Sequence, residues 1–268
     1  MWAPYTEMAT RVAGDADRPG LLATITTGAA VGLVGVGLLA LAVSTWSWRW
    51  VWTGTAVLAA AATALNLRWA PALAPAPDRR ARWTPPVRFA PALGFAFALF
   101  VGATAYLTYA TDAAARGGLG GAAGPLVFVL VGLTGLAGLR TGPLTRRVGP
   151  ARVAVLALLL LGAALALLAL GSRALPVVLG SAVAFGAANT VGSAALAIWV
   201  ARIAPEQPSG ALAVALLVGS VGAIGTPAAI GLLVARTGPV APLLGVAVFC
   251  VVVAVTAVPA GRSTPARA

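Results

Sequence analysis

Residues 153–171 read VAVLALLLLGAALALLALG and contain no charged or hydrogen-bonding side chain. An α-helix needs about 20 mostly apolar residues to cross the hydrocarbon core of a lipid bilayer. The stretch has that length, and its alanines and leucines are among the residues that favour helix most strongly. We therefore predict a membrane-spanning helix here, and with it an integral membrane protein.

Runs of the same kind recur along the whole chain. They cover residues 21–44, 50–67, 91–111, 122–140, 151–171, 174–201, 209–235 and 239–260. The 268 residues are 60% hydrophobic and 9% charged, with a mean hydropathy of +0.96, whereas a soluble globular protein carries about 25% charged residues. Because the loops between the runs are too short to fold separately, we expect an all-α polytopic membrane bundle of about eight transmembrane helices.

The side chains that perform most metal and acid–base chemistry are almost absent. The chain has no histidine, and its single cysteine, Cys250, lies in an apolar run. This excludes histidine-ligated metals, serine–histidine–aspartate and cysteine–histidine catalysis, and histidine proton relays. We expect no catalytic residue, no metal and no cofactor. A membrane-embedded acyl or glycosyl transferase is the less favoured alternative, because the apolar runs offer no carboxylate that could act as its base.

The 18 basic residues are all arginines, and they lie between the apolar runs. A net charge of +12 on a soluble domain would suggest nucleic-acid binding, but here membrane spans separate the charges. If the spans alternate in direction, 14 arginines fall on one side and four on the other. Positively charged loops stay in the cytoplasm, so we predict that both termini are cytoplasmic. We expect a multi-pass protein of a bacterial plasma membrane, in contact with lipid and not with nucleic acid.

An internal similarity indicates a repeat of six helices. Shifted by 190 residues, the chain matches itself at six of 16 positions, among them Gly32 with Gly222 and Gly35 with Gly225. The first apolar run thus resembles the seventh, and secondary transporters are commonly built from such repeats. A six-helix repeat implies twelve helices in all, so we expect the chain to lack the first four.

Residues 142–152 read GPLTRRVGPAR. This stretch resembles the cytoplasmic loop signature of the major facilitator superfamily, in which a glycine is followed by an acid–arginine pair, a second glycine and further basic residues. Gly142, Arg147, Gly149 and Arg152 fit the signature, while Arg146 stands where the family usually has aspartate, a departure common in the C-terminal copy of the loop. Glycines allow a tight turn at such a loop, and arginines anchor it on the cytoplasmic side.

The resemblance implies that the helices correspond to the family's fifth to twelfth. Residues 1–67 would then end the N-terminal bundle, 68–90 would form the cytoplasmic linker, and 91–268 would form the C-terminal six-helix bundle. The implied function is secondary active transport of a small organic solute by alternating access. The direction of transport stays open: the protein is either an uptake permease or an efflux transporter. The alternative is a non-transporting membrane scaffold, or a remnant that needs a partner chain.

Polar and aromatic side chains form stripes on two of the predicted helices. Within each stripe they recur at intervals of three or four residues, which places them on one helix face. The stripes are Phe97, Phe100, Thr104 and Thr108 on one helix, and Ser181, Phe185, Asn189 and Ser193 on the other. In the family, helices at these positions line the central cavity, so the resemblance implies that these residues contact the solute.

Stripes of this kind suit a small neutral or amphipathic organic solute, bound by hydrogen bonds and ring contacts. The alternative is that these polar groups form hydrogen bonds between neighbouring helices. For single threonines this alternative is favoured, and for Asn189 it is as good as solute contact. Among the acids, Asp112 is the best candidate for a substrate or proton contact, although a solvated carboxylate beside Arg116 is favoured over it. The coupling ion stays open, with a proton as one candidate.

Overall fold

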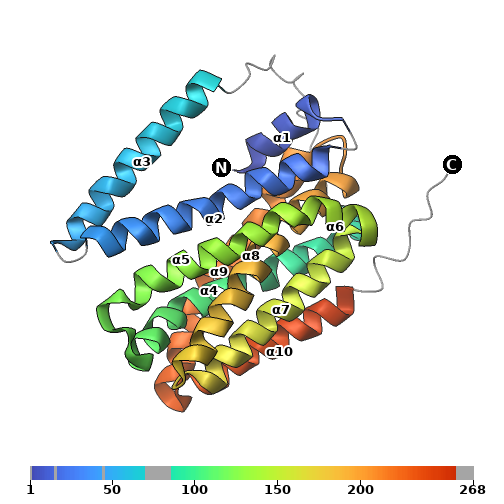
Figure 1. The fold of residues 1–268 in the computed structure, drawn as a ribbon. Helices are drawn as coiled ribbons and strands as arrows, with labels where there is room; N and C mark the ends of the chain where they lie inside the picture. Colours follow the sequence, from blue (N-terminus) through green and yellow to red (C-terminus); the bar gives the residue numbers. More distant parts are fainter. Residues whose placement is uncertain (1, 15–16, 44–45, 70–85, 258–268) are drawn as a thin grey trace.

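The structure is a computed structural model, and it describes residues 2–14, 17–43, 46–69 and 86–257. Within these ranges the chain is helical and contains no β-strand. Figure 1 shows a bundle of long helices. The helices are α1 (Trp2–Val12), α2 (Arg18–Val43), α3 (Trp48–Trp69), α4 (Ala90–Ala114), α5 (Ala123–Gly135), α6 (Thr141–Val148), α7 (Pro150–Gly171), α8 (Leu175–Ile203), α9 (Pro208–Thr237) and α10 (Val240–Ala257).

Seven continuous helical stretches are long and apolar enough to cross a membrane. One of them, Val87–Val148, contains both α4 and α5, and it reverses direction between them (Figure 1). The reversal lies at Gly118 and Gly120, whose φ angles of +112° and +50° are open to glycine and unfavourable for other residues. Within the described residues, the apolar helices thus correspond to the eight predicted runs, which confirms an all-α polytopic membrane bundle.

Proline and glycine separate the later helices. Proline stands in the first turn of α4, α7, α8 and α9, where its missing N–H leaves no helix hydrogen bond unmade. Gly149, with φ +87°, ends α6 and begins α7 directly. Because the helices alternate in direction, the charges divide between two ends of the bundle.

We call the end where α2, α4, α7 and α9 begin the basic end, and the other the opposite end. The described arginines at the basic end of the bundle are Arg11, Arg18, Arg88, Arg140, Arg146, Arg147, Arg152 and Arg202, while Arg68 lies on α3, which extends away from the bundle. Those at the opposite end are Arg49, Arg116, Arg173 and Arg236. The arginine asymmetry read from the sequence is thus an asymmetry of the folded bundle.

Helix α8 lies at the centre of the bundle, in contact with α2, α4, α5, α6, α7 and α9. In its half towards the basic end, every residue from Gly192 to Ala201 is buried. In its other half, residues such as Val183 are exposed. Helix α8 is therefore enclosed at the basic end and only partly covered towards the opposite end.

Helix α3 extends away from the bundle and packs against α2 (Figure 1). Residues 56–69 of α3 are exposed throughout. These residues are mostly alanine, leucine and threonine, so this surface is compatible with the hydrocarbon of a bilayer.

Candidate functional site

One face of α4 is not covered by the core. Phe97, Phe100 and Thr104 are partly buried and Thr108 is exposed, whereas Phe95 and Tyr106 on the other face are completely buried. The stripe predicted from the three- and four-residue spacing therefore does share one face. The hydroxyl of Thr108 donates to the Thr104 carbonyl oxygen at 2.8 Å, so it is satisfied within its own helix.

A groove of about 660 Å³ runs between α4, α9 and α10. Phe97 lies in its wall, and its ring meets that of Phe249 edge to face, with the centroids 6.1 Å apart and an interplanar angle of 87°. Its other lining residues include Val101, Gly222, Gly225, Ile230 and Ala241. The groove reaches from the middle of the bundle to the opposite end.

The groove presents almost only hydrocarbon. The hydroxyl of Thr226 donates to the Gly222 carbonyl oxygen at 2.6 Å, and that of Thr237 donates to the Leu233 carbonyl oxygen at 3.0 Å. Both hydroxyls are therefore used by the helix that carries them. A ligand in this groove would meet ring faces, methyl groups and glycine backbone.

Sequence reasoning missed the α9 and α10 walls of the groove. A signal was present in the glycines of α9, because small residues let a neighbouring helix approach closely. At Gly219 an added Cβ would lie 2.8 Å from the ring of Phe100, and at Gly222 it would lie 2.8 Å from Val101. The glycines bring α9 against the open face of α4, and the space left beside α10 becomes the groove.

On α8, Ser181 and Phe185 are completely buried against Tyr106 of α4. Ser181 donates to the Val178 carbonyl oxygen at 2.7 Å, so the 2.8 Å contact between Tyr106 and Ser181 has the tyrosine hydroxyl as donor. The Phe185 ring stacks on that of Tyr106, with centroids 4.0 Å apart and planes 8° from parallel. These two residues join α8 to α4, on the side of α4 that faces away from the groove.

The other half of the α8 stripe is different. Asn189 is half-buried near the middle of α8, and Ser193 lies one turn further on, with 8% of its surface exposed. Neither side chain has a hydrogen-bond partner within the described residues. An amide and a hydroxyl thus stand one helical turn apart with unused hydrogen-bonding capacity. The two predicted stripes do not meet in one cavity, because Tyr106 and Phe185 fill the space between α4 and α8.

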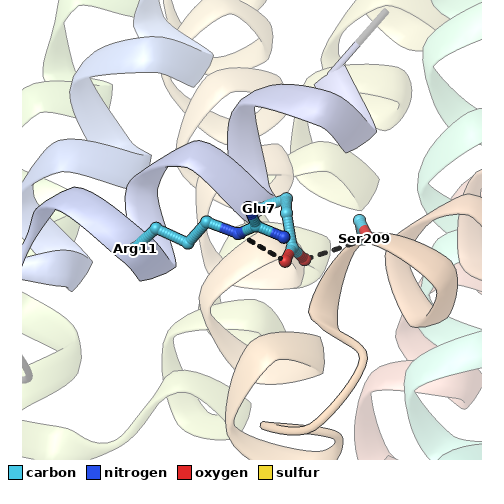
Figure 2. Close-up of polar contacts among 3 residues, drawn as sticks. All are labelled: Glu7, Arg11 and Ser209. Atoms are coloured by element: carbon cyan, nitrogen blue, oxygen red, sulfur yellow. Dashed lines mark hydrogen bonds and ion pairs between the residues drawn. The ribbon is translucent and has the colours of Figure 1, made fainter. Parts of the chain in front are cut away.

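The acidic candidates lie at the two ends of the bundle. Asp112, at the opposite end, forms an ion pair with Arg116 one turn later, and both side chains are more than half exposed. This is the solvated pairing that the sequence favoured over a substrate contact. Glu7, at the basic end, accepts hydrogen bonds from Arg11 Nε at 3.0 Å and from Ser209 Oγ at 3.3 Å (Figure 2).

The Glu7 contact joins the first described helix to α9. Ser209 is the second residue of α9, whose first turn presents unpaired backbone N–H groups. A carboxylate at this place interacts favourably with the positive end of the helix dipole. Sequence reasoning missed this contact, because no local pattern indicates that α1 and α9 meet.

The loop that resembles the family signature is folded as helix α6, not as an irregular loop. At Gly142 an added Cβ would lie 2.8 Å from Gly20 Cα and 2.9 Å from the Pro19 carbonyl oxygen, so this glycine lets α6 contact the start of α2. Arg146, Arg147 and Arg152 are exposed at the basic end. Gly149 makes the sharp turn between α6 and α7, whereas Gly142 lies inside α6 and allows a close helix contact in place of a turn.

Within the described residues, no group of three or more histidine, cysteine, aspartate or glutamate side chains is placed to hold a metal ion. The contacts available to a ligand are hydrogen bonds from α8 and apolar surface in the groove beside α4.

Comparison with known proteins agrees with this architecture. Residues 4–259 match the family model described as uncharacterised MFS-type transporter YbfB. A comparison with curated proteins finds no significant match. Because the family match extends over nearly all of the chain, and the chain folds into the predicted apolar helices, this integral, multi-pass membrane protein belongs to that family of major facilitator superfamily transporters.

Proposed function

We propose that the chain carries a small, uncharged or amphipathic organic solute across a bacterial plasma membrane by alternating access. The observation that carries this proposal is the pair of Asn189 and Ser193 near the middle of α8. A membrane-embedded amide that leaves its hydrogen bonds unmade is costly unless a ligand or water supplies them. A solute with one or two hydrogen-bonding groups would do so.

The charge distribution supports an uncharged solute. Within the described spans the carboxylates lie only near the ends, as Glu7 and Asp112 do, and both of these already pair with an arginine. An ionic solute held near the middle of the membrane would need a counter-charge there. The apolar groove beside Phe97 is a separate surface, because no residue of α8 lines it, and we assign it to the hydrocarbon part of an amphipathic solute at another point on its path.

The proposed mechanism divides the chain as the family resemblance implies. Residues 1–67 belong to the N-terminal bundle, 91–268 form the C-terminal bundle, and 68–90 connect them, although residues 70–85 of this linker lie outside the described residues. The basic end faces the cytoplasm, with both termini there. Transport then requires the two bundles to rock about a midplane site, so that the contacts of α1 and α2 with α8 and α9 break at the basic end.

A flux assay tests the proposal. The full-length protein is reconstituted in liposomes and offered neutral, amphipathic, anionic and cationic organic solutes in turn, with and without a pH gradient. We expect flux of neutral or amphipathic solutes. Asn189→Leu, which keeps the size and removes the amide, should reduce that flux by about tenfold or more, as expected when a polar contact to the solute is lost.

Ser220→Ala serves as the matched control. Its hydroxyl bonds the Leu216 carbonyl oxygen within α9, so its loss should leave flux unchanged. Equal flux by Asn189→Leu and the unaltered protein would contradict the proposed site. A folded protein that moves no solute of any class would favour the scaffold alternative, and a response of flux to the pH gradient would identify a proton as the coupling ion.

A further inference from the structure

A second cavity, of about 620 Å³, lies at the opposite end of the bundle, away from the α8 polar pair. Three segments meet there. Arg116 follows α4, Ser172 and Arg173 form the turn from α7 to α8, and Pro239 lies in the turn from α9 to α10. Two of the four described arginines of the opposite end thus border a single cavity.

The polar groups of this cavity have unused hydrogen-bonding capacity. Arg173 and Ser172 make no side-chain hydrogen bond or ion pair within the described residues. Arg116 pairs with Asp112, and its planar guanidinium has further N–H donors beyond that contact. Two arginines against one carboxylate leave one net positive charge, which matches a singly charged anion.

The cavity also has an apolar rim. Leu170, in the last turn of α7, is 73% exposed, and Val240, at the start of α10, is 40% exposed. A narrow cleft beneath the cavity, between α4, α7 and α10, is lined by Tyr109, Leu168 and Leu243. The positively charged groups therefore stand directly above the level at which the spans become apolar, where lipid headgroups meet hydrocarbon.

We propose that this cavity binds the phosphate headgroup of an anionic phospholipid. Arg116 and Arg173 contact the phosphate oxygens through paired N–H donors, and the Ser172 hydroxyl donates to the same group. The acyl chains of the lipid lie along Leu170 and Val240. A free phosphate ion would bind through the same oxygen atoms, but it would leave the apolar rim without a partner. The positive charges and the apolar rim together therefore favour a lipid.

Native mass spectrometry of the full-length protein, released from detergent in the presence of added lipid, tests this site. Phosphatidylglycerol and phosphatidylcholine carry the same phosphate diester, but only the first has a net negative charge. We expect phosphatidylglycerol to be retained in preference to phosphatidylcholine. Arg173→Ala should weaken the retention of phosphatidylglycerol by about fivefold, because it removes one charge-assisted contact at a partly exposed site. Ser172→Ala should weaken it by less.

Arg236→Ala is the matched control, because Arg236 is exposed at the same end and does not line the cavity. Its retention of phosphatidylglycerol should equal that of the unaltered protein. An equal loss in Arg236→Ala and Arg173→Ala would overturn the proposal in favour of a diffuse basic surface. Displacement of the lipid by inorganic phosphate alone would overturn it in favour of a free-anion site. Exposure of Arg173 makes misfolding of these variants a minor concern, and their melting temperatures check it.

Discussion

The hydroxyl of Tyr106 donates a 2.8 Å hydrogen bond to Ser181, and this contact ties the middle of α4 to α8 inside an otherwise apolar interior. Tyr106 is completely buried, and its ring is stacked on Phe185. Because the tyrosine is completely buried, the partner of its hydroxyl determines how much that hydroxyl contributes to stability.

Tyr106→Phe is therefore expected to destabilise the protein by about 1 kcal/mol, because it removes one interhelical hydrogen bond and keeps the ring stack. Ser181→Ala should cost a similar amount. The double variant should cost about as much as either single one, since both remove the same contact. Thermal unfolding in detergent measures all three, and fully additive losses would show that the two side chains act independently.

A second prediction concerns Glu7, whose carboxylate joins α1 to α9. Neutralising it in Glu7→Gln removes the charge that pairs with Arg11 and faces the start of α9, so α1 should separate from the bundle more often. Ala9 lies in the interface that would open, with none of its surface exposed. Ala9→Cys provides a probe, because the natural Cys250 is fully buried and should react slowly.

We expect a maleimide to label Ala9→Cys several-fold faster when Glu7→Gln is also present, on the order of fivefold for a contact worth about 1 kcal/mol. Arg11→Ala, which leaves the Ser209 bond intact, should have a smaller effect. Identical labelling rates with and without Glu7→Gln would mean that the contact does not hold α1 in place.

The close approach of α6 to α2 yields a prediction at Gly142. A Cβ at this position would lie 2.8–2.9 Å from backbone atoms of Gly20 and Pro19, which cannot turn aside as a side chain could. Gly142→Ala should therefore lower stability by about 1–3 kcal/mol. Gly94→Ala in α4 has open space around the new methyl group and should be neutral or stabilising. The difference between their melting temperatures is the measurement, and equal values would contradict this packing.

The groove beside α4 can be filled without disturbing its walls. Gly225 lines the groove and has nothing within 4 Å of an added Cβ, so Gly225→Leu should occupy the space that an apolar part of the solute would use. We expect solute flux in liposomes to fall by about tenfold while the melting temperature is retained. Gly231→Leu, also on α9 with open space but away from the groove, is its control. Undiminished flux in Gly225→Leu would remove the groove from the solute path.

The spans and the direction of each helix were predictable because they depend on local composition. The length of each apolar run predicted a membrane-spanning helix, and the positions of proline and glycine marked where helices begin and where the chain turns. The fold of residues 141–148 as helix α6 was not predicted, because their polar composition resembles that of a loop and the helix depends on contact with α2.

For the candidate site, helical spacing correctly placed the α4 residues on one face. It did not separate Ser181 and Phe185, which pack against Tyr106, from Asn189 and Ser193 on the same helix. That distinction depends on which side chains of other helices pack beside each turn of α8, and a single sequence does not contain this information. The groove was missed for the same reason, since its α4 wall is far in the chain from its α9 and α10 walls.

The fully enclosed half of α8 is rich in alanine, including Ala194, Ala195, Ala197 and Ala201. An alanine side chain has no rotamers to lose when it is covered and none to recover when it is uncovered. The alanine part of this contact surface can part and re-form without its side chains having to find their places again, which leaves only the larger side chains of the same half, such as Leu196 and Trp199, to reorder. Repeated opening of this end would then be limited by the motion of whole helices, and each closure would return to the same packed arrangement.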